Sequence, residues 1–252
     1  MNILAIETTG ATASVAIINE KEQIFEEVST GTLNHLQYLM PMIEKVLEKS
    51  QLQIGDLTAI AASEGPGSFT GIRIGVSSAR ALAQALQLKT ISVPTLKTFL
   101  YNTPDVSGIL CPIFDARRSQ VYGGAYKWKE NALRNLEGIE EIVVGDAYAL
   151  EELLALLKQA CKPNDTITFF GDGVEPYKEK IKQWQNSSLN NDIQVEFANE
   201  SVNRQTASSV ARLALDLYRE GQLKEYQELK PNYMRKAEAE RKLEESQGRQ
   251  NE

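Results

Sequence analysis

The sequence predicts an α/β protein of two lobes, each of which opens with antiparallel strands. Three short apolar runs separated by turn residues begin the chain, a pattern typical of a β-meander. Helical and strand patterns then alternate up to a stretch of linker composition at residues 102–108, after which strands begin again. We therefore assign residues 1–104 to a first lobe, residues 105–235 to a second, and residues 236–252 to a charged tail that is expected to be flexible.

Short apolar runs predict the strands of the first lobe, at residues 3–6, 13–19, 23–28, 57–62 and 90–93. Apolar residues that recur three and four positions apart predict its helices, at residues 33–49, 70–86 and 94–101. In the first of these helices, this spacing assigns the buried face to Leu36, Met40, Ile43 and Leu47. His35, Tyr38 and Met42 are therefore expected to lie off that face, where another subunit can reach them.

The same patterns predict the second lobe. Its strands are expected at residues 109–116, 120–128, 141–144, 166–170 and 193–198. Its helices are expected at residues 147–160, 174–184 and 206–220. The last helix follows all the strands and is free to pack back on the first lobe. The two lobes share an order of elements but not their residues, which indicates a weak internal repeat of topology.

Composition limits the functions open to the chain. Of its 252 residues 42% are hydrophobic, and no apolar run reaches the roughly 20 residues of a membrane span. The 34 acidic residues outnumber the 27 basic ones, and the resulting charge of −7 disfavours a protein that grips nucleic acid over its whole surface. The apolar start has an acid at position 7 and no basic segment before it, so we expect a strand rather than a signal peptide, and a cytoplasmic protein.

Two residue counts exclude common metal and nucleophile sites. His35 is the only histidine, so no His-rich zinc site forms within the chain, and a Ser-His-Asp triad would have to use this residue. Cys111 and Cys161 are far apart and no CxxC is present, which excludes a zinc ribbon. These two counts therefore remove the histidine- and cysteine-based metal sites and most nucleophile chemistry from the isolated chain.

The most informative segment is a glycine loop, Ser-Glu-Gly-Pro-Gly-Ser-Phe-Thr-Gly-Ile-Arg-Ile-Gly, at residues 63–75. It joins a predicted strand to a predicted helix, so its free backbone N–H groups suit either an anion or a tightly packed neighbour. Gly65, Gly67 and Ser68 are the candidate anion contacts, and Arg73 offers a further donor. The lysine of a P-loop is absent, which weakens the case for phosphate binding.

The helix after this loop carries a ridge of tiny side chains. Gly71, Gly75, Ala79 and Ala83 follow one another at steps of four residues, and Ser78 widens the same surface. Glycine inside a helix costs about 1 kcal/mol relative to alanine, so a close neighbour is expected to offset that cost. The spacing alone leaves open whether this neighbour belongs to another chain or to the same lobe.

Two hairpins carry residues that a nucleotide cleft would use. Glu7 and Thr8 stand where actin-like ATPases place an Asp for the metal and a Gly beside the phosphate, although an ordinary β-hairpin is the simpler interpretation. In the second hairpin Asp115 precedes Arg117 and Arg118. These arginines would either hold an anionic ligand or a partner carboxylate, or belong to a solvent-exposed turn.

Four segments together resemble the bacterial TsaB (YeaZ) family: the opening Ile-Leu-Ala-Ile-Glu-Thr-Thr, the glycine loop, Asp-Ala-Arg-Arg-Ser-Gln-Val-Tyr, and the late Pro-Asn-Tyr-Met-Arg. The resemblance runs from residue 1 to about residue 235 and implies a two-lobed actin-like fold of the sugar kinase, Hsp70 and actin class (ASKHA). It also implies a part in forming N6-threonylcarbamoyladenosine beside the anticodon of tRNAs that read codons starting with A. In that pathway the family is a non-catalytic partner of TsaD, and the ATPase TsaE joins the pair.

The resemblance places the partner face on the helices at residues 33–49 and 70–86, which are also expected to form a homodimer when TsaD is absent. The residues carried over to this face are His35, Leu36, Leu39, Met42, Gly71, Arg73, Gly75, Ser78, Ala79 and Ala83. The ridge is then expected to receive a partner helix, and Gly75→Leu to keep the fold while abolishing TsaD binding. TsaD carries a metal-binding HxxxH in its first helix, whereas here Leu39 stands four residues after His35, in place of the second histidine. The resemblance therefore implies that ATP or ADP and a metal are held by the partner subunits.

Two other functions compete with this one. A small-molecule kinase or ATPase of the actin-like class would bind Mg-ATP through Glu7, Asp115 and the glycine loop. Against it stand a glutamate where an aspartate is usual and two arginines where a glycine is usual. Direct tRNA binding is disfavoured by the acidic balance, so the partner is expected to supply most phosphate contacts.

Overall fold

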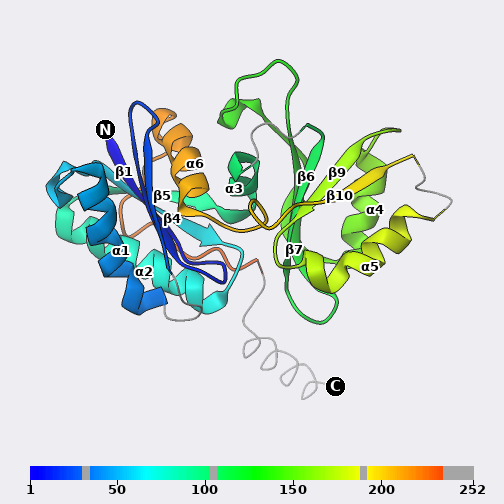
Figure 1. Ribbon diagram of the computed structural model, residues 1–252, viewed down its shortest axis with the longest axis horizontal. Coiled ribbons are helices and arrows are strands. Elements are labelled where there is room, and N and C mark those ends of the chain that lie inside the picture. Colours follow the sequence, from blue (N-terminus) through cyan, green and yellow to red (C-terminus); the bar gives the residue numbers. More distant parts are fainter. Residues whose placement is uncertain (30–34, 103–106, 188–191, 235–252) are drawn as a thin grey trace, which may run out of the picture.

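A computed structural model describes residues 1–29, 35–102, 107–187 and 192–234. Two five-stranded sheets, each with its own helices, make up two lobes that lie side by side (Figure 1). The two-lobed α/β fold expected from the sequence is therefore confirmed. The predicted lobe boundary between residues 104 and 105 and the predicted tail at residues 236–252 lie outside the described residues.

The first sheet has the strand order β3-β2-β1-β4-β5. Its strands are β1 (Asn2–Glu7), β2 (Ser14–Asn19), β3 (Ile24–Val28), β4 (Ala59–Gly65) and β5 (Lys89–Pro94). β1, β2 and β3 pair antiparallel as a meander, whereas β4 and β5 extend the sheet in parallel. Its connecting helices are α1 (His35–Ser50), the short 3-10 helix η1 (Ile54–Asp56), α2 (Phe69–Leu86) and α3 (Thr95–Asn102).

The second sheet repeats this topology. Its strands are β6 (Ile109–Asp115), β7 (Gln120–Trp128), β8 (Ile139–Ala149), β9 (Thr166–Phe170) and β10 (Gln194–Phe197). The order β8-β7-β6-β9-β10 matches that of the first sheet when strands are counted from β6, with the same antiparallel and parallel pairings. Its other elements are η2 (Leu136–Gly138), α4 (Leu150–Ala160), α5 (Val174–Gln185) and α6 (Ala207–Arg219).

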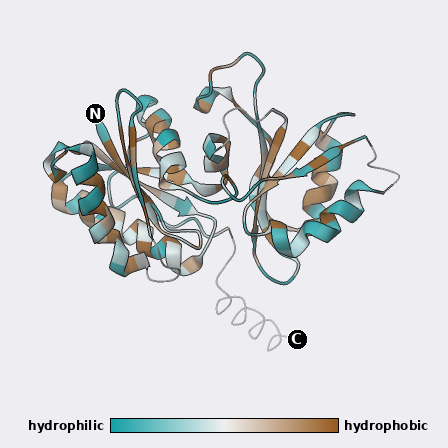
Figure 2. Cartoon of the chain, viewed as in Figure 1, coloured by the Kyte–Doolittle hydropathy of each residue, from teal (hydrophilic) through white to brown (hydrophobic). Residues whose placement is uncertain are grey.

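Alternation along β1 explains how the layers are arranged. Successive side chains of a strand point to opposite faces of its sheet. Leu4 and Ile6 are buried beneath α1 and α2. Ile3 and Ala5 are buried on the other face, in a core that includes α3, α6 and the inner face of the second sheet. Hydrophobic segments run along the strands of both sheets (Figure 2), so the sheet faces supply most of the core.

α6 comes from the end of the second lobe but packs on β1 and β2 of the first. Its apolar stripe, which includes Val210, Leu213 and Leu217, is buried there. α3 lies beside it between the two sheets (Figure 1). These two helices therefore form a layer shared by both lobes, while α4 and α5 cover the outer face of the second sheet.

Three predicted elements have boundaries that are wrong. The strand expected at residues 141–144 runs from Ile139 to Ala149, and the helix expected from residue 147 begins at Leu150. β8 pairs with β7 as far as Ala149, opposite Gln120, so tertiary strand pairing overrides the helical pattern of those residues. The strand expected at residues 57–62 lies at 59–65, because β4 continues beside β5 into the glycine loop.

Candidate partner interface and interlobe loops

The buried face of α1 differs from the predicted one. Leu39, Met42 and Ile43 face the sheet, whereas Leu36 is 67% exposed and Met40 is 47% exposed. α1 has more apolar residues than one face can bury. Two overlapping apolar stripes therefore fit the helical spacing, and the sequence alone does not show which of them is buried. The expected partner contacts through Leu39 and Met42 are therefore wrong, because both side chains are used inside the lobe. His35 begins α1, but its side chain is outside the described part of the chain.

The small-residue ridge of α2 is covered by its own lobe. Gly71, Gly75, Ala79 and Ala83 are all buried, and the two alanines lie in the core with Leu4. A Cβ atom on Gly71 would meet the carbonyl oxygen of Thr8 at 1.9 Å. The ridge thus lets α2 approach the end of β1 closely, and the expectation that these four residues receive a partner helix is wrong.

Thr8 makes this close approach specific. Its hydroxyl donates a hydrogen bond to the Gly71 carbonyl at 2.7 Å, and a Cβ atom on Gly75 would lie 2.4 Å from the same hydroxyl oxygen. A leucine at position 75 would overlap β1 within the core. The expectation that Gly75→Leu keeps the fold is therefore also wrong, since this substitution tests folding rather than TsaD binding.

An exposed aromatic cluster lies at the start of α2. The guanidinium carbon of Arg73 lies 3.9 Å from the centroid of the Phe69 ring, and its Nε donates to the Tyr233 hydroxyl at 2.8 Å. The Phe69 and Tyr233 rings are 5.0 Å apart, and both side chains are exposed. Among the predicted interface residues, Leu36 and Arg73 are thus accessible and Ser78 is half-buried.

Glu7 is fully buried and its carboxylate is used within the first lobe. Its Oε1 accepts hydrogen bonds from the Thr9 N–H at 2.5 Å and the Thr9 hydroxyl at 2.6 Å, and its Oε2 accepts one from the Ser63 hydroxyl. Burial raises the pKa of Glu7 above its ordinary value, and the Ser63 and Thr9 hydrogen bonds oppose that rise. Glu7 and the buried Thr8 therefore do not face a ligand, and their expected nucleotide contacts are wrong.

The glycine loop is filled by the chain's own backbone. Gly65 and Gly67 have φ values of +119° and +149°, which side chains rarely allow. Added Cβ atoms would lie 2.7 Å from the carbonyl oxygen of Asn232 and 2.7 Å from Thr9 Cβ, respectively. Ser68 caps α2, because its hydroxyl oxygen accepts the Gly71 N–H at 3.2 Å. The loop's close neighbours are thus the β1–β2 turn and the segment at residues 231–234.

In the second hairpin, the Asp115 carboxylate is hydrogen-bonded within the lobe, whereas Arg117 and Arg118 are exposed. Asp115 accepts the Arg117 N–H at 2.8 Å and the Tyr177 hydroxyl at 3.1 Å, so its carboxylate is largely satisfied. Arg117 and Arg118 both have positive φ, which costs of the order of 1 kcal/mol for each residue, and both side chains are exposed. The expected anion contacts at this hairpin stay a prediction.

Among the described residues, a small cavity lies between the two predicted halves of a nucleotide cleft. Between the glycine loop and the second lobe, the cavity that Phe69, Tyr122 and Met234 help to line measures about 40 Å³. Small-molecule sites usually measure roughly 300 Å³ or more. Among the described residues there is no group of three or more His, Cys, Asp or Glu side chains placed to hold a metal ion. The described helices also include none that is long and apolar enough to cross a membrane.

Sequence reasoning missed Met40, Phe69 and Tyr233 as surface residues. Met40 was assigned to the core by its spacing, and Phe69 lay one residue before the predicted helix. Tyr233 reaches α2 from a distant part of the chain, through a hydrogen bond from Arg73 that no local pattern encodes. The excess of apolar residues around α1 was the one signal that pointed to an exposed apolar stripe.

Comparison with known proteins gives consistent results. The model of a family described as TsaD, tRNA N6-adenosine threonylcarbamoyltransferase, matches residues 28–243. The TsaB protein of Bacillus subtilis (strain 168), named for tRNA threonylcarbamoyladenosine biosynthesis, is 35% identical over 182 residues, which are 72% of this chain and 76% of that protein. The TsaB protein of Escherichia coli (strain K12) is 35% identical over 155 residues, which are 57% of this chain and 62% of that protein.

A solved structure supports the same assignment at the level of the fold. YeaZ from Pseudomonas aeruginosa has a TM-score of 0.72 and covers 92% of this chain and 99% of its own, at 22% identity. The repeated strand order and this likeness agree with the actin-like fold implied by the sequence resemblance. The chain belongs to the TsaB (YeaZ) family of tRNA threonylcarbamoyladenosine biosynthesis proteins.

Proposed function

We propose that the chain is a non-catalytic subunit that pairs with TsaD in the formation of N6-threonylcarbamoyladenosine on tRNA. The names of its relatives and the match to the TsaD family model support the pathway and the partner. The proposed interface consists of the exposed face of α1, the start of α2 and Tyr233, and we call it the α1–α2 surface. TsaE is proposed to join this pair, and nucleotide and metal to be held by the partner subunits.

One observation carries the choice of surface. The described residues include nine exposed large apolar side chains, and five of them lie on the α1–α2 surface. These five are Leu36, Tyr38, Met40, Phe69 and Tyr233. α1 and α2 lie next to each other on the outer face of the first sheet (Figure 1). Exposed apolar side chains on two neighbouring helices, with an arginine among aromatic rings, are typical of a protein–protein interface.

The free energy gained by burying these side chains is of the size that a specific complex needs. Full burial of a side chain such as leucine or methionine contributes about 1.5–3 kcal/mol. Because Leu36 is already one-third covered and Met40 about half covered, a partner would gain about 1–2 kcal/mol from Leu36 and about 0.7–1.4 kcal/mol from Met40. Aromatic rings and arginine often contribute more than other residues when they are buried at the centre of an interface. The α1–α2 surface therefore offers several anchors that do not require a rearrangement of the lobe.

The chain's own groups favour this role over an ATP-dependent kinase. Glu7, the candidate metal carboxylate, is buried and occupied by Ser63 and Thr9. The cavity beside the glycine loop is about 40 Å³, far smaller than a nucleotide site. Calorimetry of the isolated chain with Mg-ATP tests this directly. We expect no saturable heat, and binding in the micromolar range would contradict a non-catalytic subunit.

Aspartate substitutions on α1 test the interface. Leu36→Asp and Met40→Asp place a charge on the proposed surface without touching the core, since both side chains are exposed. Val144→Asp is the matched control, because Val144 is 64% exposed on β8 in the other lobe. We expect each α1 variant to weaken binding to purified TsaD at least about tenfold in calorimetry, and the control to bind like the wild type.

The same variants separate pairing from catalysis. In a reconstituted transfer assay with TsaD, TsaE and tRNA, Leu36→Asp is expected to lower the rate at limiting concentrations and to recover partly at excess. A loss of rate with TsaD binding intact would contradict a role confined to pairing. Sedimentation of the chain alone tests the proposed homodimer, which Leu36→Asp is expected to shift towards monomer. If Leu36→Asp and Val144→Asp bind TsaD equally well, the α1–α2 surface is not the interface.

A further inference from the structure

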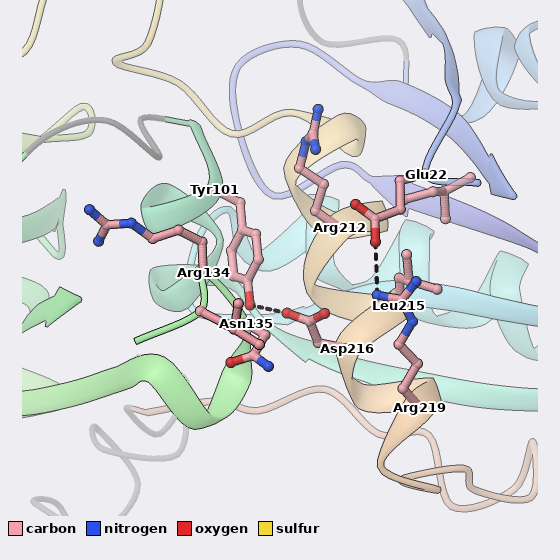
Figure 3. Close-up of a pocket in the computed structure, with 10 residues that line it drawn as sticks. Glu22, Tyr101, Arg134, Asn135, Arg212, Leu215, Asp216 and Arg219 are labelled. Atoms are coloured by element: carbon pink, nitrogen blue, oxygen red, sulfur yellow. Dashed lines mark hydrogen bonds and ion pairs between the residues drawn. The ribbon is translucent and has the colours of Figure 1, made fainter. Parts of the chain in front are cut away.

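A second, larger cavity lies between the lobes, away from the α1–α2 surface. It measures about 250 Å³ and is lined by β2 and the turn after it, the end of α3, the segment just before η2, and one face of α6. Figure 3 shows that Tyr101 and Asp216 meet at its centre. Its size approaches that of small-molecule sites, and none of the residues assigned to the partner interface lines it.

The carboxylates of this cavity are already satisfied. Asp216 accepts the Tyr101 hydroxyl at 2.5 Å and also a hydrogen bond from the Leu136 N–H of the second lobe. Glu22 pairs with Arg219, with Oε1 and Nη1 2.9 Å apart. A cation entering the cavity would therefore have to displace hydrogen bonds that the chain already makes.

The unused groups are donors. Arg212 has neither a hydrogen bond nor an ion pair with any residue that the structure describes, and Arg134 has only a contact over the Trp128 ring, 5.3 Å from its centroid. The amide oxygen of Asn135 accepts the Gly138 N–H, which leaves its NH₂ group free within the described ranges. Arg134, Arg212 and Arg219 lie on different sides of the Tyr101–Asp216 pair, and the guanidinium groups of Arg134 and Arg212 point away from it (Figure 3).

The charges and the floor together define the ligand. The lining contains three guanidinium groups and two carboxylates, so the cavity is locally positive in a chain with a charge of −7. Ile18 and Leu215, both buried, supply an apolar floor. We propose that the cavity binds a small organic anion, with its phosphate or carboxylate group held by Arg134 and Arg212. Arginine is suited to this task because its planar donors match the oxygens of both groups.

Trp128 provides a local reporter of binding. Its ring lies 5.4 Å from the Tyr101 ring and beneath Arg134, so a ligand that draws Arg134 into the cavity changes the surroundings of the indole. The chain has one other tryptophan, Trp184 at the end of α5, and Trp184→Phe leaves Trp128 as the only one. Fluorescence of this variant is titrated with inorganic phosphate, adenosine monophosphate or citrate at constant ionic strength.

We expect a saturable change with a dissociation constant of about 1 mM or tighter for at least one probe. A response to adenosine monophosphate alone identifies the ligand as a phosphate ester, and a response to citrate alone identifies it as a carboxylate. A response to inorganic phosphate shows that binding does not need contact with the apolar floor. Arg212→Gln and Arg134→Gln should each weaken binding about tenfold or more, because each removes a charge-assisted contact. Arg80→Gln on α2 is the matched control and should bind like its parent.

Thermal unfolding with the same probes gives a second readout that does not depend on Trp128. A bound anion should raise the midpoint in the parent and not in the double variant Arg134→Gln, Arg212→Gln. The proposal is overturned if none of the probes gives a saturable response in either measurement. It is also overturned if the double variant binds as tightly as the control. Binding to TsaD is measured separately, so the outcome is independent of the proposed partner interface.

Discussion

Gly71→Ala is the sharpest test of how α2 is seated. The added methyl group would lie 1.9 Å from the Thr8 carbonyl oxygen, whereas real contacts of this kind are not shorter than about 3.0 Å. α2 or the β1–β2 turn must therefore move by about 1.1 Å, and the Thr8–Gly71 hydrogen bond of 2.7 Å is lost or stretched. Overpacking costs about 1–3 kcal/mol and a buried unpaired group about 1–3 kcal/mol, while the gain in helix propensity is about 1 kcal/mol.

The expected net effect is a loss of about 1–5 kcal/mol in the free energy of unfolding, or roughly 2–20 °C in the melting temperature. Urea unfolding followed by circular dichroism measures this loss. Gly55→Ala is the control, since a Cβ atom at Gly55 has no heavy atom within 4 Å, and it should be neutral or slightly stabilising. If Gly71→Ala is as stable as Gly55→Ala, the seating of α2 against β1 is wrong.

Three further predictions concern buried titratable groups. Burial raises the folded-state pKa of Glu7 above 4.5, so the folded state loses stability as pH rises through that pKa. In urea unfolding, the free energy of unfolding of Glu7→Gln should therefore increase relative to that of the wild type from pH 4 to pH 8. A constant gap would contradict this sign. Tyr101→Phe removes a donor to Asp216 and should cost about 1–3 kcal/mol by the same assay at pH 7, with an unchanged stability arguing against that contact. Burial raises the pKa of Cys161 to about 11 and that of Cys111 further, so a thiol reagent at pH 8 should modify Cys161 slowly and Cys111 only on unfolding. Fast modification of both would refute this.

The glycine loop shows how far local patterns reach into the site. Its sequence predicted a strand, a tight turn and a helix with a close neighbour, and all three are present. The neighbour is Thr8 of the same lobe rather than another chain. Small side chains indicate only that a neighbouring segment packs closely against them. Which segment this is depends on how β1 and α2 are placed across the sheet.

Outside that loop, too, some of the proposed contact residues were identified from the sequence and others only from the tertiary structure. The family resemblance placed Leu36 and Arg73 on the partner face, and both are accessible, although the helical spacing had assigned Leu36 to the buried face. Phe69 and Tyr233 were not identified. Tyr233 joins the surface through a hydrogen bond to Arg73 from far along the chain. The cavity between Arg134 and Arg212 was also beyond the sequence, because it forms only where α6 returns to the first lobe beside η2.

The sequence by itself determined the kinds and order of the elements, the repeated topology and the family, because these depend on periodicity and on motifs of neighbouring residues. Tertiary structure decided which stripe of α1 is buried, what covers Gly71 and Gly75, and which donors face the interlobe cavity. These features depend on contacts between residues distant in the chain. An apolar or small side chain has the same local signature whether it packs on its own sheet or meets another protein.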